Sequence, residues 1–61
     1  MDKSIVEYEY YKIIKDFEEE QYDDFQKEKY LEFKEDLANK SGNKELLSAC
    51  KLVRDKIDSS K

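Results

Sequence analysis

The stretch EEEQYDD, residues 18 to 24, decides whether this chain folds as three helices or as one long helix and a shorter one. It separates two sets of apolar residues that recur at helical spacing, Val6, Tyr10, Ile13, Ile14 and Phe17 before it and Phe25, Tyr30, Phe33 and Leu37 after it. At about 100° per residue the sets centre roughly half a turn apart on one continuous helix, so a break here would let both face one core. The stretch contains neither glycine nor proline, which keeps an unbroken helix from about residue 5 to 40 as the alternative.

Capping residues indicate where the first two helices begin. Ser4, with Glu7 three residues later, forms a capping box ahead of an apolar run. Asp23, with Gln26 three residues later, forms a second and weaker box. These two signals predict one helix that starts just after Ser4 and another that starts at Asp23.

The third helix follows NKSGNKE, residues 39 to 45, which contains the only glycine of the chain. Gly42 suits a left-handed residue at the end of a helix, and Asn43 suits the N-cap of the next one. The apolar face of that helix is Leu46, Cys50, Val53 and Ile57, widened by Leu47, Ala49 and Leu52. The prediction is an all-α fold in a single small domain, residues 1–61, with helices over about 5–20, 23–40 and 44–58. The alternative is one long N-terminal helix with the C-terminal helix packed back on it.

The size of the chain limits how it can be stabilised. A domain of 61 residues buries only about 60% of the surface that its unfolded chain exposes, so the core is thin. Cys50 is the only cysteine and there is no histidine, which excludes a disulfide within the chain and a Cys/His zinc site. Oligomerisation is the remaining common way to stabilise such a domain, and a homodimer is one form of it. A lone thiol and the lack of an apolar run of about 20 residues predict a cytoplasmic protein without a membrane partner.

The negative charge is concentrated in one place. The net charge is −4, yet residues 16–24 alone carry six acids and no base: Asp16, Glu18, Glu19, Glu20, Asp23 and Asp24. We interpret this acidic patch as a docking surface for a protein partner with a basic surface, or as an imitation of nucleic-acid phosphates. The simpler interpretation is a solvated corner between two helices. Direct binding of nucleic acid is not expected, because phosphates would be repelled.

No pattern in the sequence points to catalysis, to a cofactor or to a metal. There is no histidine to act as a general base, and one glycine cannot form a phosphate-binding loop. The acidic stretch lacks the central glycine and the alternating ligands of a calcium loop. Cys50 lies on the apolar face of its helix, which favours a buried, inert thiol. We therefore expect a protein that is not an enzyme and has no cofactor.

The first helix is apolar on two sides. Val6, Tyr10 and Ile13 belong to the core face, whereas the other side carries Ile5, Tyr8 and Tyr11. Tyrosine is enriched at interfaces, because its ring is apolar and its hydroxyl tolerates water. Ile5, Tyr8 and Tyr11 are therefore the predicted apolar part of a partner-binding site, with the acidic patch as its charged part.

A different backbone is the last alternative. IVEYEYY, residues 5 to 11, also alternates between apolar and acidic residues as a strand does. A strand followed by two helices is similar in layout to the ribbon-helix-helix DNA-binding dimers. That resemblance implies a ribbon that contacts DNA, but Glu7 and Glu9 would face an anionic duplex.

The function that these patterns favour is that of a small acidic protein that binds another protein as a regulator, inhibitor or adaptor. The composition resembles that of the short accessory proteins encoded by phages and mobile elements of AT-rich bacteria. The alternatives are a nucleic-acid mimic that inhibits or regulates a DNA-binding protein and, below it, a ribbon-helix-helix-like dimer.

Overall fold

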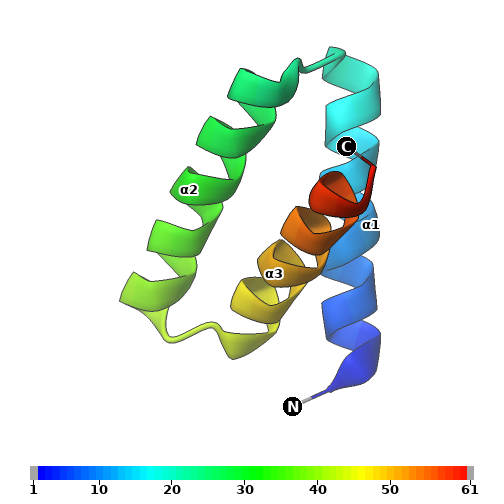
Figure 1. The fold of residues 1–61 in the computed structure, drawn as a ribbon. Helices are drawn as coiled ribbons and strands as arrows, with labels where there is room; N and C mark the ends of the chain where they lie inside the picture. The colour runs from blue at the N-terminus through cyan, green and yellow to red at the C-terminus, as the bar shows by residue number, and fades with distance from the viewer. Residues whose placement is uncertain (1, 61) are drawn as a thin grey trace.

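The computed structural model describes residues 2–60 and shows three helices and, over these residues, no strand (Figure 1). α1 spans Lys3–Glu20, α2 spans Asp24–Ser41 and α3 spans Lys44–Ser59. The prediction of an all-α bundle of three helices is confirmed, and the alternative of one long N-terminal helix is wrong. The ribbon predicted over residues 5–11 is wrong as well, because a helix places Val6 and Tyr10 together against the core.

α1 ends at a left-handed residue that is not a glycine. Gln21 has φ 53° and ψ 46°, and its N–H donates to the carbonyl of Glu18 at 3.3 Å. The N–H of Tyr22 donates to the carbonyl of Phe17 at 3.2 Å, which completes a Schellman motif. The Tyr22 ring packs edge-on against Phe17, with 6.0 Å between the ring centroids, and this apolar contact often accompanies the motif. The break between α1 and α2 therefore forms without glycine or proline.

α2 and α3 begin at the predicted caps. The Asp23 side chain accepts a hydrogen bond from the backbone N–H of Gln26 at 2.8 Å, and the Gln26 side chain accepts one from the backbone N–H of Asp23 at 3.0 Å. Gly42 ends α2 with φ 70°. Asn43 caps α3, since its side chain accepts from the N–H of Leu46 at 3.1 Å. The capping predictions for these two helices are confirmed.

The start of α1 differs from the prediction. Asp2 is the N-cap, and its carboxylate accepts a hydrogen bond from the N–H of Ser4 at 2.9 Å. The predicted capping box of Ser4 and Glu7 is wrong, because Ser4 lies inside the first turn. Aspartate caps a helix about as well as serine. The earlier start also adds a helical hydrogen bond from the N–H of Val6 to the carbonyl of Asp2, at 3.2 Å.

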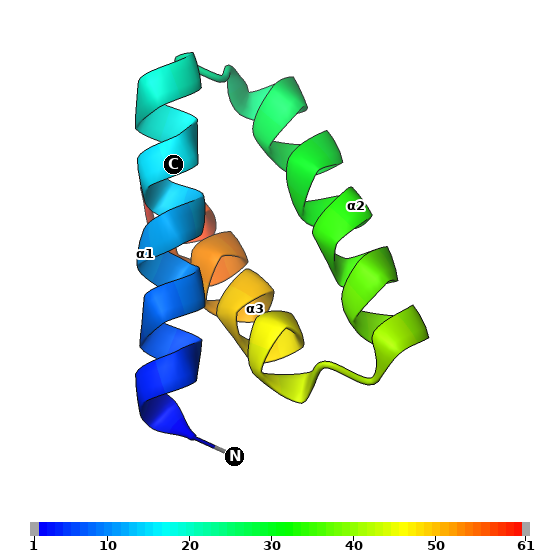
Figure 2. The ribbon, with the colours of Figure 1, turned by 180° about the vertical axis from the view of Figure 1, so that it is seen from behind.

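α3 lies between the other two helices and packs against both (Figure 1 and Figure 2). α1 and α2 are joined at the Gln21 turn and diverge away from it. The core cluster consists of Ile13, Phe17, Leu31, Ala49, Cys50 and Val53. Partly buried apolar side chains surround it, namely Val6, Tyr10, Ile14, Tyr22, Tyr30, Leu46 and Ile57. The core is thin, as the length of the chain predicts.

α2 turns a different face to the core from the one predicted. Its buried residues are Leu31 and Ala38, and of the predicted stripe only Tyr30 packs against the core. The other three large side chains are exposed to solvent: Phe25 at 70%, Phe33 at 61% and Leu37 at 42%. The predicted apolar face of this helix is therefore wrong at those three positions.

Arg54 of α3 forms hydrogen bonds with two glutamates of α2. Its Nη2 and Nε donate to Glu35 at 2.6 Å and 3.1 Å, and its Nη1 donates to Glu28 at 2.9 Å. These hydrogen bonds, above all those to Glu35, raise the pKa of Arg54 above its ordinary value. Glu28 and Glu35 lie seven residues apart, about two turns along one side of α2. A single guanidinium thus binds α2 at two levels, on the side of the helix that carries Leu31.

Candidate protein-binding surface

The outer edge of the contact between α1 and α3 exposes apolar side chains from both helices. Tyr11 of α1 and Leu52 of α3 are exposed at 66% and 46%. Together with Glu7 and Tyr10 they line an open depression of about 280 Å³. The rings of Tyr10 and Tyr11 meet edge to face, with 5.2 Å between their centroids, and this contact helps to orient the exposed Tyr11 ring.

A second depression, of about 370 Å³, lies further along the same edge, nearer the Gln21 turn. Its apolar lining is Ile14, Phe17 and Ile57, and its polar lining is Glu18, Asp24, Lys27, Lys56 and Ser60. Positions 7, 11, 14 and 18 follow one another at steps of four, three and four, which places them on one side of α1. We call the side chains around both depressions the seam surface: Glu7, Tyr10, Tyr11, Ile14, Phe17, Glu18, Asp24, Lys27, Leu52, Lys56, Ile57 and Ser60.

The three apolar residues predicted to bind a partner are all exposed and follow one another at steps of three along α1, and only Tyr11 lines one of the depressions. Tyr11 belongs to the seam surface, and Tyr8 lies about one turn before it, with the Lys12 ammonium 5.9 Å from its ring centroid. Ile5 is exposed at 47% but lies about 120° round the helix from Tyr11. The structure instead brings Tyr11 together with Leu52, which the sequence pattern placed on the core face of its helix. In the sequence, the exposure of Leu52 is indicated by its position at the edge of that apolar stripe.

The six carboxylates of the acidic patch have different surroundings. Asp16 accepts a hydrogen bond from the Tyr30 hydroxyl at 2.7 Å, and Asp23 caps α2, so both serve the fold. Asp24 lies in the first turn of α2, where the helix dipole favours an acid. The other three, Glu18, Glu19 and Glu20, end α1, whose last turn carries no basic residue. Only these three lie where the dipole of their own helix opposes them.

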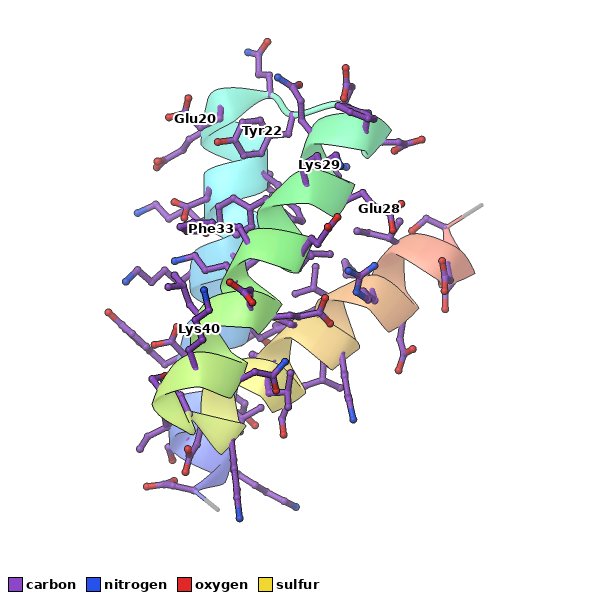
Figure 3. The ribbon with its side chains drawn as sticks, turned by 90° about the vertical axis from the view of Figure 1, so that its left-hand side faces the viewer. Glu20, Tyr22, Glu28, Lys29, Phe33 and Lys40 are labelled. Atoms are coloured by element: carbon purple, nitrogen blue, oxygen red, sulfur yellow. The ribbon has the colours of Figure 1, made fainter. Side chains whose placement is uncertain are left out.

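The glutamates at the end of α1 are therefore electrostatically unfavourable. A carboxylate at a helix C-terminus costs about 0.3–1 kcal/mol. Glu19 forms an ion pair with Lys15 at 3.7 Å, but both side chains are exposed, so this pair contributes little to stability. Figure 3 shows Glu20 at this end of the molecule, beside Tyr22. Residues that oppose their own helix are often found where a protein binds something else.

The seam surface offers contacts and charge for binding. No protein-family model, curated protein or solved structure matches this chain. Residues 2–60 contain no cluster of side chains that could hold a metal ion, and no helix among them has the length and hydropathy to cross a bilayer. Cys50 is fully buried, and burial raises the pKa of its thiol to about 11, so little thiolate forms at neutral pH.

Proposed function

We propose that this protein is not an enzyme and acts by binding another protein, which lays a basic, amphipathic segment along the seam surface. The observation that carries the proposal is the exposure of Tyr11 and Leu52 side by side on neighbouring helices. Large apolar side chains that are held at a depression, with charged residues around them, are typical of the centre of a protein interface.

The dimensions of the seam surface suit a short helix. Eleven residues separate Glu7 from Glu18, which corresponds to about 16 Å along α1, or about three turns of a partner helix. The two depressions, about 280 and 370 Å³, lie along this length and would each receive a large apolar side chain. An amphipathic helix in a groove uses anchors at such spacing.

The charge around the seam surface favours a basic partner. Glu7 lines one depression, and Glu18 and Asp24 line the other together with Lys27 and Lys56. Glu19 and Glu20 follow at the end of α1, so acids outnumber bases around the seam surface. Lysine or arginine on the partner would offset the unfavourable position of these carboxylates on their own helix. Such pairs increase the rate of association and select the partner more than they add affinity.

Mimicry of nucleic acid is the weaker candidate. Lys27 and Lys56 line the same depression as Glu18 and Asp24, so the row of negative charge is interrupted. The role that we propose is that of a cytoplasmic regulator, inhibitor or adaptor, of the kind that phages and mobile elements encode. The single buried thiol of Cys50 suits a reducing compartment.

Affinity capture from the native host tests the proposal, with the wild type and two variants as baits. Tyr11→Ala combined with Leu52→Ala should lower the amount of captured partner by about tenfold or more. Ile5→Ala is the matched control. Ile5 is exposed to the same extent as Leu52, and it lies about 120° round α1 from Tyr11. Equal capture by the wild type and the double variant would refute the seam surface as the binding site.

A charge variant then separates the two candidate functions. Neutralising Glu18, Glu19 and Glu20 together to glutamine should weaken capture several-fold and reduce its salt dependence. Capture that depends on these glutamates but not on Tyr11 and Leu52 would favour the nucleic-acid mimic instead. Circular dichroism of each bait confirms that its helices are intact.

A further inference from the structure

The outer face of α2 is the second large apolar surface of the molecule, and it lies away from the seam surface. We define it by the residues that point away from the core along this helix: Phe25, Lys29, Glu32, Phe33, Asp36 and Lys40. Phe25 and Phe33 are exposed at 70% and 61%. Figure 3 looks onto α2 from this side, with Lys29, Phe33 and Lys40 following one another along the helix.

α2 exposes two phenylalanines on its outer face, while Leu31 and Ala38, together with the partly buried Tyr30, face the core. Leu31 and Ala38 are its buried residues, and the positions around them are polar, including the half-buried Lys27, Lys34 and Glu35. Tyr30 is the one aromatic residue of α2 that packs against the core, whereas Phe25 and Phe33 lie outside it, so a second contact on the outer side would bury apolar surface that the monomer leaves exposed. The molecule as a whole exposes 4656 Å², whereas a compact monomer of 7.4 kDa exposes about 4200 Å².

The charges on this face identify the occupant. Two lysines and two acids make the outer face of α2 neutral in a chain of net charge −4, so two copies that meet here bring together no excess of like charge. A parallel pairing of two α2 helices would place each charge beside its own copy. An antiparallel pairing reverses the order and allows opposite charges to meet.

We propose that α2 pairs antiparallel with α2 of a second copy of this chain, about a two-fold axis between Glu32 and Phe33. With the axis there, residues whose numbers add up to 65 lie at the same level along the two helices. Lys29 of each copy then meets Asp36 of the other, Phe25 meets Lys40, and Phe33 meets Glu32, so that the two Phe33 rings lie on either side of the axis. The isologous contact closes on itself and leaves the seam surface free.

The ion pairs within one chain that this pairing would break contribute little to stability. In the single chain Lys29 lies 3.9 Å from Glu32 and 5.6 Å from the centroid of the Phe25 ring, and Lys40 lies 3.1 Å from Asp36. All four charged side chains are more than 60% exposed, so these pairs contribute little. Helix α2 is about 27 Å long and about 10–12 Å wide, which gives a contact well below the roughly 800 Å² per partner of a standard interface. The dimer is therefore weak and depends on protein concentration.

Analytical ultracentrifugation of the purified chain over a concentration series tests the proposal. The wild type should pass from monomer to dimer, and Phe33→Asp should raise the dissociation constant by at least about tenfold. Tyr8→Asp is the matched control, because Tyr8 has the same exposure as Phe33 but lies on α1, and it should leave the equilibrium unchanged. A wild type that stays monomeric at the highest concentration, or a dimer that Phe33→Asp leaves intact, overturns the proposal.

A charge exchange tests the register of the two helices. Lys29→Glu alone and Asp36→Lys alone should each weaken the dimer, because each places like charges opposite one another. The double variant should restore most of the lost affinity, because the pair is re-formed with its signs reversed. Failure of the double variant to recover would refute this register. Since Tyr11 and Leu52 are unchanged in all these variants, the result is independent of the proposed partner binding.

Discussion

Tyr30 of α2 donates a hydrogen bond to Asp16 of α1, with 2.7 Å between its hydroxyl oxygen and Oδ2. Phe17 lies beside it, with 5.2 Å between the Phe17 and Tyr30 ring centroids. The pair joins α1 to α2 close to the turn that connects them. Asp16, predicted to bind a partner, thus has its role inside the molecule.

Tyr30→Phe should lower the free energy of unfolding by about 1–2 kcal/mol, because it removes this hydrogen bond and keeps the ring. Burial, and then the bond to Asp16, raises the pKa of Tyr30 above its ordinary value of 10.0. The unfolded chain therefore loses this proton first, and stability falls as the pH rises past about 10. Urea titrations at pH 7 and pH 10.5 should show a smaller alkaline loss in Tyr30→Phe than in the wild type.

Arg54→Lys should lower the free energy of unfolding by about 1–2 kcal/mol, although it keeps the positive charge. A lysine cannot form the two-pronged contact with Glu35 and reach Glu28 at the same time. Thermal denaturation should show a melting temperature lower by several degrees. Lys51→Arg on exposed α3 surface is the control, and equal melting temperatures for wild type and Arg54→Lys would contradict the prediction.

Gln21→Gly should stabilise the protein by roughly 1 kcal/mol, because glycine adopts φ 53° without the clash that a side chain suffers there. Gly42→Ala should have the opposite effect, since Gly42 has φ 70° and its surroundings are open, so only backbone strain is added. Gln21→Ala controls for the loss of the glutamine side chain and should be nearly neutral. A Gln21→Gly variant no more stable than Gln21→Ala would show that the turn is not strained.

Leu31→Ala and Phe33→Ala, two residues apart, test which face of α2 is inside. Leu31 is 1% exposed, so its truncation should cost about 2–4 kcal/mol and could unfold so small a domain. Phe33 is 61% exposed, so its truncation should change the stability of the monomer by less than about 1 kcal/mol. Chemical denaturation at low protein concentration makes the comparison, and the reverse order would mean that α2 is rotated.

Cys50 should react with a thiol reagent only as fast as the protein opens. The side chain is fully buried and burial raises its pKa to about 11, so both access and thiolate are lacking at pH 8. Urea below the unfolding transition should accelerate labelling in proportion to the unfolded fraction. Rapid labelling of the native protein, at the rate of a small free thiol, would contradict the burial of Cys50.

Local signals in the sequence were sufficient to predict the ends of α2 and α3. The capping box of Asp23 and Gln26 spans four residues, and Gly42 with Asn43 forms a turn of its own. The break at Gln21 was predicted for a reason that does not hold. Ile13 and Leu31 are 18 residues apart, five turns at 3.6 residues per turn, so one long helix would have kept both on one side. The Schellman motif and packing on α3 produce the break instead.

The face of α2 and the seam surface could not be predicted in the same way. Phe33 is the more apolar choice for the core, but contacts with other helices, Arg54 with Glu35 and Tyr30 with Asp16, lie on the side of α2 that carries Leu31. Leu52 is one of seven apolar residues predicted for the inner side of α3, and its exposure follows from where α1 lies. Both depend on how helices that are far apart in the sequence pack together. The periodicity within one helix carries no information about that packing.

The position of α3 between its neighbours also determines when the chain can fold during synthesis. α1 and α2 leave the ribosome first, yet they make few contacts with each other and each packs mainly on α3. Ile13 and Leu31 therefore stay exposed to water until Ala49, Cys50 and Val53 have emerged. Folding has to follow translation of the last helix, and before that moment the nascent chain is a substrate for chaperones and proteases.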